Sequence, residues 1–463
     1  MTEPGTRRIA EELSALGRLA WPLALANAAQ SLMGVVDTAI LGRAGAAPLA
    51  GTGLGNLIFW AIAILGVGLM MGLDPLISQA VGSGDRARAR SLLWQGVWLA
   101  GGVAAVLAVP MALTPSTLVP LGIPPEVARQ ATGYLLLRMP SLPFLLFFYA
   151  GRSYLQAHGV ARAVLLTALA ANLVHVPVDL LLVFGGSSLP EWAGPLHLVP
   201  AMGAAGSGLA TSLSFALQAG ILGLAIRWIG LERPVRGLRH AAPLEMRRAI
   251  RVGLPVGLHL AAEVGVFALV GFLAGRLGRD PLAAHQIAIA LGSFSFNAAV
   301  GIGNAGSVRV GWAVGARDTA AARRAGLTAF GAGAGFMSLV GLAYIAFPTA
   351  LARLMTNQTE VVAVAAPLMV VAGFFQISDG IQGVGAGVLR GAGDTRFTFL
   401  ANMVGHWAVG LPVALALGVG LGLGVTGLWW GLCAGLTAVA VGLLWRFLKI
   451  SAREIVPLAE RAR

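Results

Sequence analysis

Residues 51–73 read GTGLGNLIFWAIAILGVGLMMGL, an uncharged run of 23 residues. An α-helix needs about 20 mostly apolar residues to cross a bilayer, so this run predicts a transmembrane helix. The whole chain has the same character, because 57% of its 463 residues are hydrophobic and only 11% are charged. A soluble domain carries roughly 25% charged residues. The sequence therefore predicts an all-α membrane protein whose solvent is the lipid bilayer.

Twelve such apolar runs occur along the chain, which predicts a multi-pass protein with both ends on the same side of the membrane. We expect the helices at residues 18–42, 50–80, 91–114, 131–156, 162–184, 200–229, 248–275, 282–312, 322–348, 364–390, 396–418 and 424–447.

The distribution of Lys and Arg predicts which side that is. Basic residues collect in cytoplasmic loops. With the N-terminus in the cytoplasm, 26 of the 32 basic residues fall in cytoplasmic segments. Both termini are therefore expected in the cytoplasm, and the net charge of +13 needs no nucleic-acid partner to explain it. The six basic residues expected outside are Arg43, Arg129, Arg138, Arg276, Arg279 and Arg353.

The two halves of the chain are related by an internal repeat. LGRAGAAPLAG (41–51) corresponds to AGRLGRDPLAA (274–284), and VGSGDRARARS (81–91) corresponds to VGARDTAAARR (314–324). Six helices in each half give the copies the same orientation, a parallel repeat that transporters use around a central cavity. We expect an N-terminal six-helix bundle (1–229), a basic cytoplasmic linker (230–247), and a C-terminal six-helix bundle with a short basic tail (248–463).

Signatures of other protein classes are missing from the sequence. It contains no GxxxxGK[ST] loop for ATP, no HExxH motif and no plausible Ser-His-Asp order. The single cysteine, Cys433, has no partner for a disulfide or a cysteine metal site. The N-terminus lacks the short apolar core of a cleavable signal peptide. We therefore expect a membrane protein that is not an enzyme and needs no organic cofactor.

Four acidic residues lie inside predicted spans: Asp37, Asp179, Glu263 and Asp379. A charged side chain near the bilayer centre costs a few kcal/mol, so each one calls for a function. Polar residues at three- and four-residue spacing accompany them on the same helices, and such faces must look into the bundle or a wet cavity. The accompanying residues with an expected cavity, substrate or supporting role are Asn27, Gln30, Thr38, Asn172, His175, His259, Gln286, Asn297, Gln376 and Gln382.

Two interpretations of these polar groups stay open. Asn, Gln and Ser side chains commonly stitch membrane helices together by static hydrogen bonds, and buried histidines are more often packed than proton carriers. A buried carboxylate without a basic partner can instead exchange a proton or bind Na⁺ through its oxygens. Glu263 and Asp379 are expected to form a cation site, with Na⁺ as a candidate, in the C-terminal half. Asp37 and Asp179 are expected to form a separate protonation site in the N-terminal half.

Several stretches resemble the multidrug and toxic compound extrusion (MATE) family, in its NorM-like branch. They are MGVVDTAILGRAG (33–45), ANLVHVPVDLLLVFGG (171–186), PLAAHQIAIALGSFSFNAAVGIGNAGSVRVG (281–311) and FFQISDGIQGVGAGVLRGAGDTR (374–396), and the similarity covers roughly residues 15–450. The resemblance implies a V-shaped fold of two bundles in a bacterial inner membrane. It also implies antiport, in which Na⁺ or H⁺ enters while organic, often cationic compounds leave.

The resemblance also implies roles for single residues. In NorM-like members the helix-7 glutamate and the helix-10 aspartate serve the coupling cation, here Glu263 and Asp379. In proton-coupled prokaryotic homologues the helix-1 and helix-5 aspartates do so, here Asp37 and Asp179. Because this chain has all four acidic residues, the resemblance does not show whether Na⁺ or H⁺ is the coupling ion. Two departures are Phe375, where a tyrosine is frequent, and His175, where an asparagine is common.

Two other functions are weaker alternatives. A lipid-linked precursor flippase of the same wider superfamily needs a cavity rich in Arg or Lys, whereas the acids here favour cationic or amphipathic substrates. A membrane-embedded enzyme needs a nucleophile or metal cluster, for which His259 and Glu263 are too sparse. We expect small organic substrates, no nucleic-acid partner and a monomer.

Overall fold

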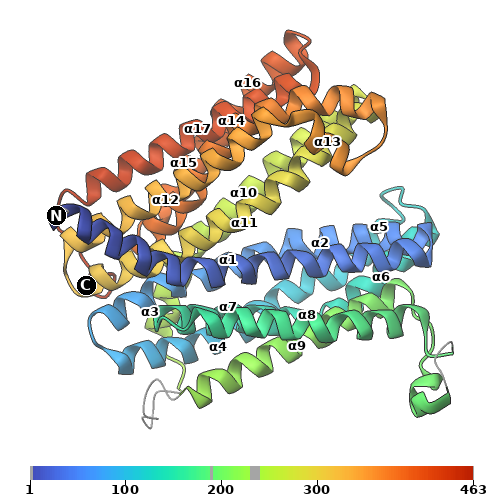
Figure 1. Ribbon diagram of the computed structural model, residues 1–463. Helices are drawn as coiled ribbons and strands as arrows, with labels where there is room; N and C mark the ends of the chain where they lie inside the picture. The colour runs from blue at the N-terminus through green and yellow to red at the C-terminus, as the bar shows by residue number, and fades with distance from the viewer. Residues whose placement is uncertain (1–3, 188–190, 230–239, 462–463) are drawn as a thin grey trace. The chain divides into compact units, whose positions relative to one another are not determined.

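The structure of the protein is a computed structural model, which describes residues 4–187, 191–229 and 240–461 (Figure 1). In these residues the only regular structure is helical. The elements are α1 (Pro4–Ala44), α2 (Ala46–Met71), α3 (Leu73–Gly82), α4 (Arg86–Leu113), α5 (Pro115–Leu118), α6 (Pro125–Arg138), α7 (Ser141–Ala157), α8 (Ala161–Phe184), the 3₁₀ helix η1 (Glu191–Leu198), α9 (Ala204–Trp228), α10 (Pro243–Leu277), α11 (Arg279–Gly315), α12 (Thr319–Ala346), α13 (Pro348–Met355), α14 (Thr359–Gly391), α15 (Thr395–Asn402), the π-helix η2 (Met403–Gly410), α16 (Leu411–Leu415), the π-helix η3 (Ala416–Gly420) and α17 (Gly424–Ile450).

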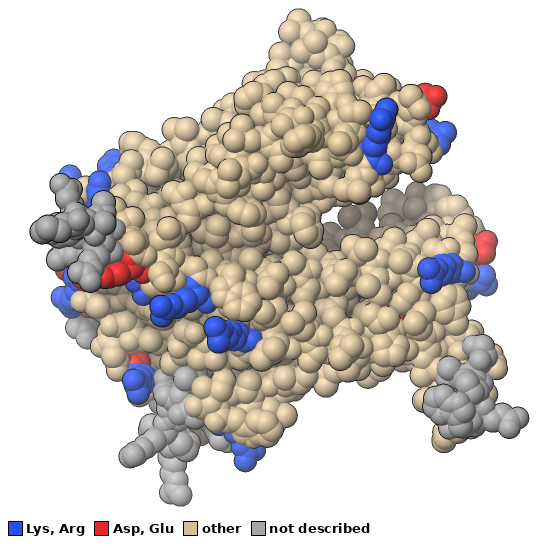
Figure 2. Space-filling view, in the orientation of Figure 1, with Lys and Arg blue, Asp and Glu red and all other residues tan. Residues whose placement is uncertain are grey.

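The predicted all-α membrane fold is confirmed. Among the described residues, 11 helices are long and apolar enough to cross a membrane, and a bent pair of helices brings the number to 12. On the face seen in Figure 2, charged side chains gather toward the ends of the helices, and the surface between them is largely uncharged. This is the surface that a bilayer requires, since lipid cannot solvate charged groups.

The predicted single helix at 131–156 is wrong in detail. The structure has two helices there, α6 and α7, which are bent by 47° at their junction. Pro140 lies in the junction, and a proline lacks the N–H that a continuous helix would use. The span at 50–80 is likewise divided, because α2 ends at Met71 and α3 begins at Leu73.

The internal repeat is also visible in the backbone. Left-handed φ angles occur at Gly45 and Gly278 (124° and 129°), at Gly84 and Arg317 (78° and 58°), and at Gly159 and Gly393 (78° and 77°). The members of each pair are 233 or 234 residues apart (278 − 45, 317 − 84, 393 − 159). Gly45 and Gly278 both precede a long helix, α2 and α11. The two halves thus repeat their turn geometry as well as their sequence.

Two compact units make up the described chain. One contains residues up to 25, residues 74–86 and residues from 251 onward, and the other contains residues 26–73 and 87–250. We call them the C-unit and the N-unit. Of the predicted cytoplasmic linker, residues 230–239 lie outside the described residues, and Pro243 already begins α10. The division at 229 and 248 describes the sequence repeat and stays a prediction.

The core of the C-unit is built around α14 and α17. α14 packs against α11, α12 and α17, and its glycines allow the close approach that small residues give membrane helices. A Cβ at Gly387 would collide with the backbone of Gly303 on α11. Trp429 of α17 is only 1% exposed at the centre of this packing.

α3 also belongs to the C-unit, where polar bonds hold it. Asp74 forms an ion pair with Arg390 of α14 at 3.1 Å, and both side chains are buried. Gln79 Nε2 donates to Gly391 O at 3.0 Å, while its Oε1 accepts from the backbone of Leu458 at 2.8 Å. The charge of Asp74 is thus neutralised inside the unit.

The N-unit packs α8 against α9, and α6 against both α2 and α9. Small residues again permit close contacts, because a Cβ at Gly206 would collide with the carbonyl group of Leu182. This arrangement brings α8 and α9 to the segment of α1 that carries Asp37.

Candidate functional site

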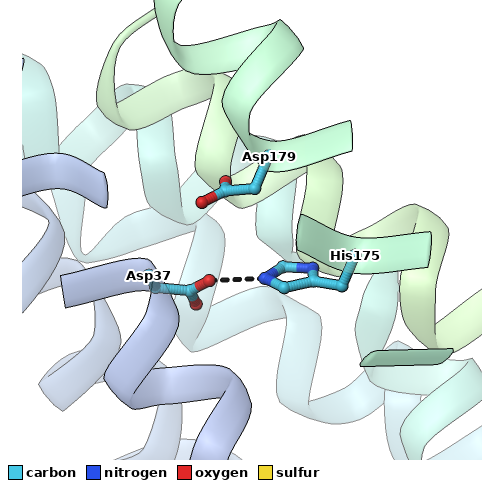
Figure 3. Close-up of side chains that lie close together, drawn as sticks. All are labelled: Asp37, His175 and Asp179. Atoms are coloured by element: carbon cyan, nitrogen blue, oxygen red, sulfur yellow. Dashed lines mark hydrogen bonds and ion pairs between the residues drawn. The ribbon is translucent and has the colours of Figure 1, made fainter. Parts of the chain in front are cut away.

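Three titratable side chains meet inside the N-unit: Asp37 of α1, and His175 and Asp179 of α8. One ligand atom from each lies within 4.8 Å of the others. Asp37 is 6% exposed, and His175 and Asp179 are fully buried. In Figure 3 the Asp179 carboxylate points from the next turn of α8 toward the Asp37–His175 pair. The four-residue spacing of His175 and Asp179 puts both on one helix face.

A chain of hydrogen bonds fixes the His175 ring. The Ser214 hydroxyl of α9 donates to Ala210 O at 2.8 Å. This bond uses the only hydrogen of the hydroxyl group. Ser214 Oγ lies 3.0 Å from His175 Nδ1, so it must accept a hydrogen bond from Nδ1–H. The other ring nitrogen, Nε2, lies 2.5 Å from Asp37 Oδ1. Since neither atom can approach the other so closely without a hydrogen between them, one proton lies in that bond.

Asp179 differs from its neighbours because both its carboxylate oxygens are buried without a hydrogen-bond partner among the described residues. The Ser207 hydroxyl is close enough to interact with this carboxylate, but the two groups do not meet the geometry of a full hydrogen bond. Burying an ionised carboxylate without donors is costly. A proton on Asp179 would remove the charge and supply a donor, so this residue is suited to gain and lose a proton.

Polar residues predicted in the same helices hold this site in place. Asn172 Nδ2 donates to Ala29 O at 3.0 Å, which ties α8 to α1. Gln30 Nε2 donates to Gln218 Oε1 of α9 at 3.1 Å. Arg152 of α7 donates to Asn27 Oδ1 at 3.4 Å. Thr38 is instead exposed and donates to Gly34 O of its own helix at 2.9 Å.

A second polar cluster lies in the C-unit around Glu263 of α10. His259 Nε2 lies 2.9 Å from Glu263 Oε2, and Gln382 Nε2 of α14 donates to the same oxygen at 3.2 Å. Gln382 Nε2 also lies 3.3 Å from Asn402 Oδ1. The amide oxygen of Gln382 is buried and has no donor among the described residues. Glu263 is thus held by donors, and an uncommitted oxygen lies beside it.

Asp379 lies on α14, three residues before Gln382, and is 6% exposed. No hydrogen bond or ion pair joins it to any described residue, Glu263 included. The neighbouring Gln376 is fully buried and accepts from Ser295 Oγ at 3.2 Å. Phe375 packs against Trp429 with ring centroids 5.3 Å apart. The structure therefore places the two predicted cation ligands in one unit without joining them directly.

Two further predicted residues, Gln286 and Asn297, belong to α11. Gln286 is exposed. Asn297 donates to Ser293 O of its own helix at 3.0 Å.

Sequence reasoning missed several partners of the predicted residues. Ser214 orients His175, and Asn402 contacts Gln382. His406 is 1% exposed, and neither ring nitrogen has a hydrogen-bond partner among the described residues. His406 lies in the π-helix η2, a form of helix that is frequent at functional sites. Nothing in the sequence pattern distinguishes Ser214 from other helix-packing serines.

Comparison of sequences identifies relatives along nearly the whole chain. The sequence profile of the MatE family matches residues 22–181 and 255–416. The multidrug resistance protein NorM of Burkholderia vietnamiensis is 36% identical over 441 residues, which cover 93% of this chain and 92% of that protein. A probable multidrug resistance protein NorM of Xanthomonas axonopodis pv. citri is 33% identical over 454 residues, or 97% and 96% of the two chains.

Comparison of structures identifies the same fold. The Vibrio cholerae MATE transporter VcmN, in its bent form, superposes with a TM-score of 0.84 at 20% identity, and the match covers 96% of this chain and 98% of that one. The eukaryotic MATE transporter AtDTX14 has a TM-score of 0.83 at 21% identity, with 98% and 99% coverage. The predicted fold and the prediction of a transporter rather than an enzyme are therefore confirmed. The chain belongs to the MatE family of multi-pass membrane transporters.

Proposed function

We propose that this protein is a secondary antiporter that exports organic, mostly cationic or amphipathic compounds by alternating access across a bacterial inner membrane. Relatives at 33–36% identity are named for multidrug resistance. The buried charges of both clusters are acidic, which favours cationic substrates over anionic ones. We further propose that both termini face the cytoplasm, as the distribution of basic residues predicts.

The observation that carries the proposal is the Asp37–His175–Asp179 cluster. The Asp37–His175 pair then has a net charge of zero, because it holds the Nδ1 proton and the shared proton, whether the shared proton lies on the carboxyl group or on Nε2. Asp179 is then the member whose charge changes. When it is ionised the cluster carries one negative charge, and when it is protonated the cluster is neutral.

This charge change links proton uptake to substrate release. A cationic compound is attracted to the ionised cluster, and a proton on Asp179 removes that attraction. Proton and substrate therefore favour different states of the same site, and a ligand shifts a conformational equilibrium only through such a difference in affinity. We propose H⁺ as the ion that couples at this cluster, with no cofactor.

We propose a second, separate cation site in the C-unit, formed by Glu263 and Asp379. Their carboxylate oxygens, with the donor-free Gln382 Oε1, are hard ligands of the type that Na⁺ accepts. His259 and Gln382 Nε2 orient Glu263 for this role.

Efflux of ethidium from proteoliposomes tests both proposals, with a pH gradient and a Na⁺ gradient imposed separately. We expect pH-driven efflux to be lost in Asp37→Asn and Asp179→Asn. The matched control is Thr167→Ala, because Thr167 is also buried on α8 but donates only to Ala163 O of its own helix.

Two outcomes would contradict the proposal. If neither gradient drives efflux of ethidium from correctly inserted wild-type protein, the export of cationic compounds is excluded. If both aspartate variants transport like Thr167→Ala, the N-unit cluster does not couple H⁺ to export.

A further inference from the structure

A basic cavity of about 360 Å³ lies in the C-unit, where α17 ends and the C-terminal tail begins. The charged side chains that line it come from α17, from the tail, and from the residue that precedes α15. They are Asp394, Arg446, Lys449, Arg453, Glu454 and Arg461. With four cations and two anions the lining has a net charge of +2 (4 − 2). The cavity belongs to neither cluster of buried acids.

Two of the four cations are committed to the protein itself. Arg446 Nε donates to Asp394 Oδ2 at 2.6 Å. Arg461 donates to three backbone carbonyl oxygens, those of Ala392, Gly393 and Val456, at 2.8–3.1 Å. These bonds fix the positions of two residues that line the cavity and hold the tail against the end of α14.

The other two cations, Lys449 and Arg453, are exposed. Neither has a carboxylate oxygen within 4.0 Å in the part of the chain that the structure describes. They are therefore available to an anion. The carbonyl groups at the C-terminal end of α17 carry partial negative charge and would repel an anion. Arg323 donates to one of them, Leu448 O, at 3.4 Å, and its positive charge offsets this repulsion.

The cavity adjoins an apolar surface of α17. Val441, Trp445 and Leu448 are spaced four and three residues apart, which places them on one face, and they are 62%, 53% and 37% exposed. Lys449 Nζ lies 4.9 Å from the centre of the Trp445 ring. Trp beside Lys is typical of the membrane–water interface. The surface that lipid tails cover thus leads directly to the two available cations.

We propose that this cavity binds the headgroup of an anionic phospholipid. Lys449 and Arg453 contact its phosphate, and its acyl chains lie along the stripe of Val441, Trp445 and Leu448. This stripe distinguishes a lipid from a free phosphate, which would gain nothing from it. Basic pockets at the ends of transmembrane helices are suited to such headgroups. The proposal does not depend on the coupling ion.

Native mass spectrometry of the purified protein in detergent tests the proposal. The probes are phosphatidylglycerol, phosphatidylcholine with the same acyl chains, and inorganic phosphate. We expect phosphatidylglycerol to bind and the other two to bind far more weakly. Lys449→Gln/Arg453→Gln should weaken its binding about twenty-fivefold, from roughly fivefold for each basic side chain.

The matched control is Arg86→Gln/Arg324→Gln, which removes the same charge from exposed positions of the same unit that do not line the cavity. It should bind phosphatidylglycerol like the wild type. Equal loss in both double variants would show an unspecific charge effect and overturn the proposal. Binding of inorganic phosphate as tight as that of the lipid would assign the cavity to free phosphates instead. If the double variant does not fold, the single variants Lys449→Gln and Arg453→Gln give the same comparison.

Discussion

His175 Nε2 lies 2.5 Å from Asp37 Oδ1, and the opposite ring nitrogen of His175 lies 3.0 Å from Ser214 Oγ. A single imidazole ring therefore connects α1, α8 and α9 of the N-unit. Because Ser214 is a hydrogen-bond acceptor toward the ring, the proton between His175 and Asp37 cannot move to Nδ1. Asparagine, which is common at this position in the family that the sequence resembles, could donate to Asp37 but could not hold a proton.

The first prediction concerns that shared proton. His175→Asn should lower pH-driven ethidium efflux about tenfold or more, because asparagine can donate to Asp37 but cannot hold the shared proton. The charge-assisted hydrogen bond that this proton makes contributes about 1.5–3 kcal/mol. Ser214→Ala should have a smaller effect, within about tenfold, since it removes one neutral hydrogen bond of about 0.5–1.5 kcal/mol. Initial efflux rates in proteoliposomes measure both, with Thr167→Ala as control. A larger loss of efflux in Ser214→Ala than in His175→Asn would contradict the proposal that the His175–Asp37 bond matters more for transport than the His175–Ser214 bond.

The second prediction separates stability from transport at Asp179. Its carboxylate oxygens are buried without donors among the described residues. Asp179→Asn keeps the shape and removes the unsatisfied charge, which costs about 1–3 kcal/mol or more. We expect a higher thermal unfolding temperature in detergent at alkaline pH, together with loss of pH-driven efflux. A variant that unfolds at lower temperature than the wild type would show that Asp179 has a structural partner.

The third prediction concerns a buried ion pair, Asp74 and Arg390, where removal of one charge should lower the unfolding temperature rather than raise it. Asp74 and Arg390 lie 3.1 Å apart, and Arg390 also donates to Asn304 Oδ1 at 2.7 Å. Removing one member of a buried ion pair costs about 3–5 kcal/mol, because the other charge loses its partner. Asp74→Asn should therefore lower the unfolding temperature of the protein.

The double variant Asp74→Asn/Arg390→Gln provides the control for this third prediction. It removes both charges and should recover part of the lost stability, which a double-mutant cycle in detergent measures. Additive losses in the two single variants would show that the pair does not interact.

The fold was largely predictable from the sequence, because lipid imposes a simple rule. Runs of about 20 apolar residues must be helices, and each of the twelve predicted runs corresponds to a span or to the bent pair α6–α7. The bend itself was not predicted. Pro22 and Pro110 lie inside continuous helices, so proline alone does not show where a span divides.

The candidate sites were predictable only in part. Asp37, His175 and Asp179 were singled out because charge and polarity are rare in a span, and the structure brings them together. Glu263 and Asp379 were singled out by the same rule, yet no hydrogen bond joins them. The rarity of charged residues in a span identifies candidate functional residues, but it does not show which other side chains they contact. Partners such as Ser214 are common residues, and only the packing of α8 on α9 reveals them.

The last prediction tests whether the two clusters serve different ions. Glu263 is held by His259 and Gln382 in the C-unit, and Asp37 is held by His175 in the N-unit. Glu263→Gln keeps a hydrogen-bonding group but removes the charge that would bind Na⁺. We expect it to abolish Na⁺-driven ethidium efflux and to keep pH-driven efflux within about threefold of the wild type. A threefold change in rate is smaller than the change expected when a hydrogen bond to a charged group is lost, which is about tenfold or more.

Asp37→Asn should show the reverse pattern, with pH-driven efflux lost and any Na⁺-driven efflux retained. The two variants therefore serve as controls for each other, since a general folding defect would lower both activities in the same variant. If Glu263→Gln abolishes pH-driven efflux as completely as Asp37→Asn does, the clusters do not act separately. The coupling proton would then have to depend on Glu263, and the Asp37–His175 bond would be structural.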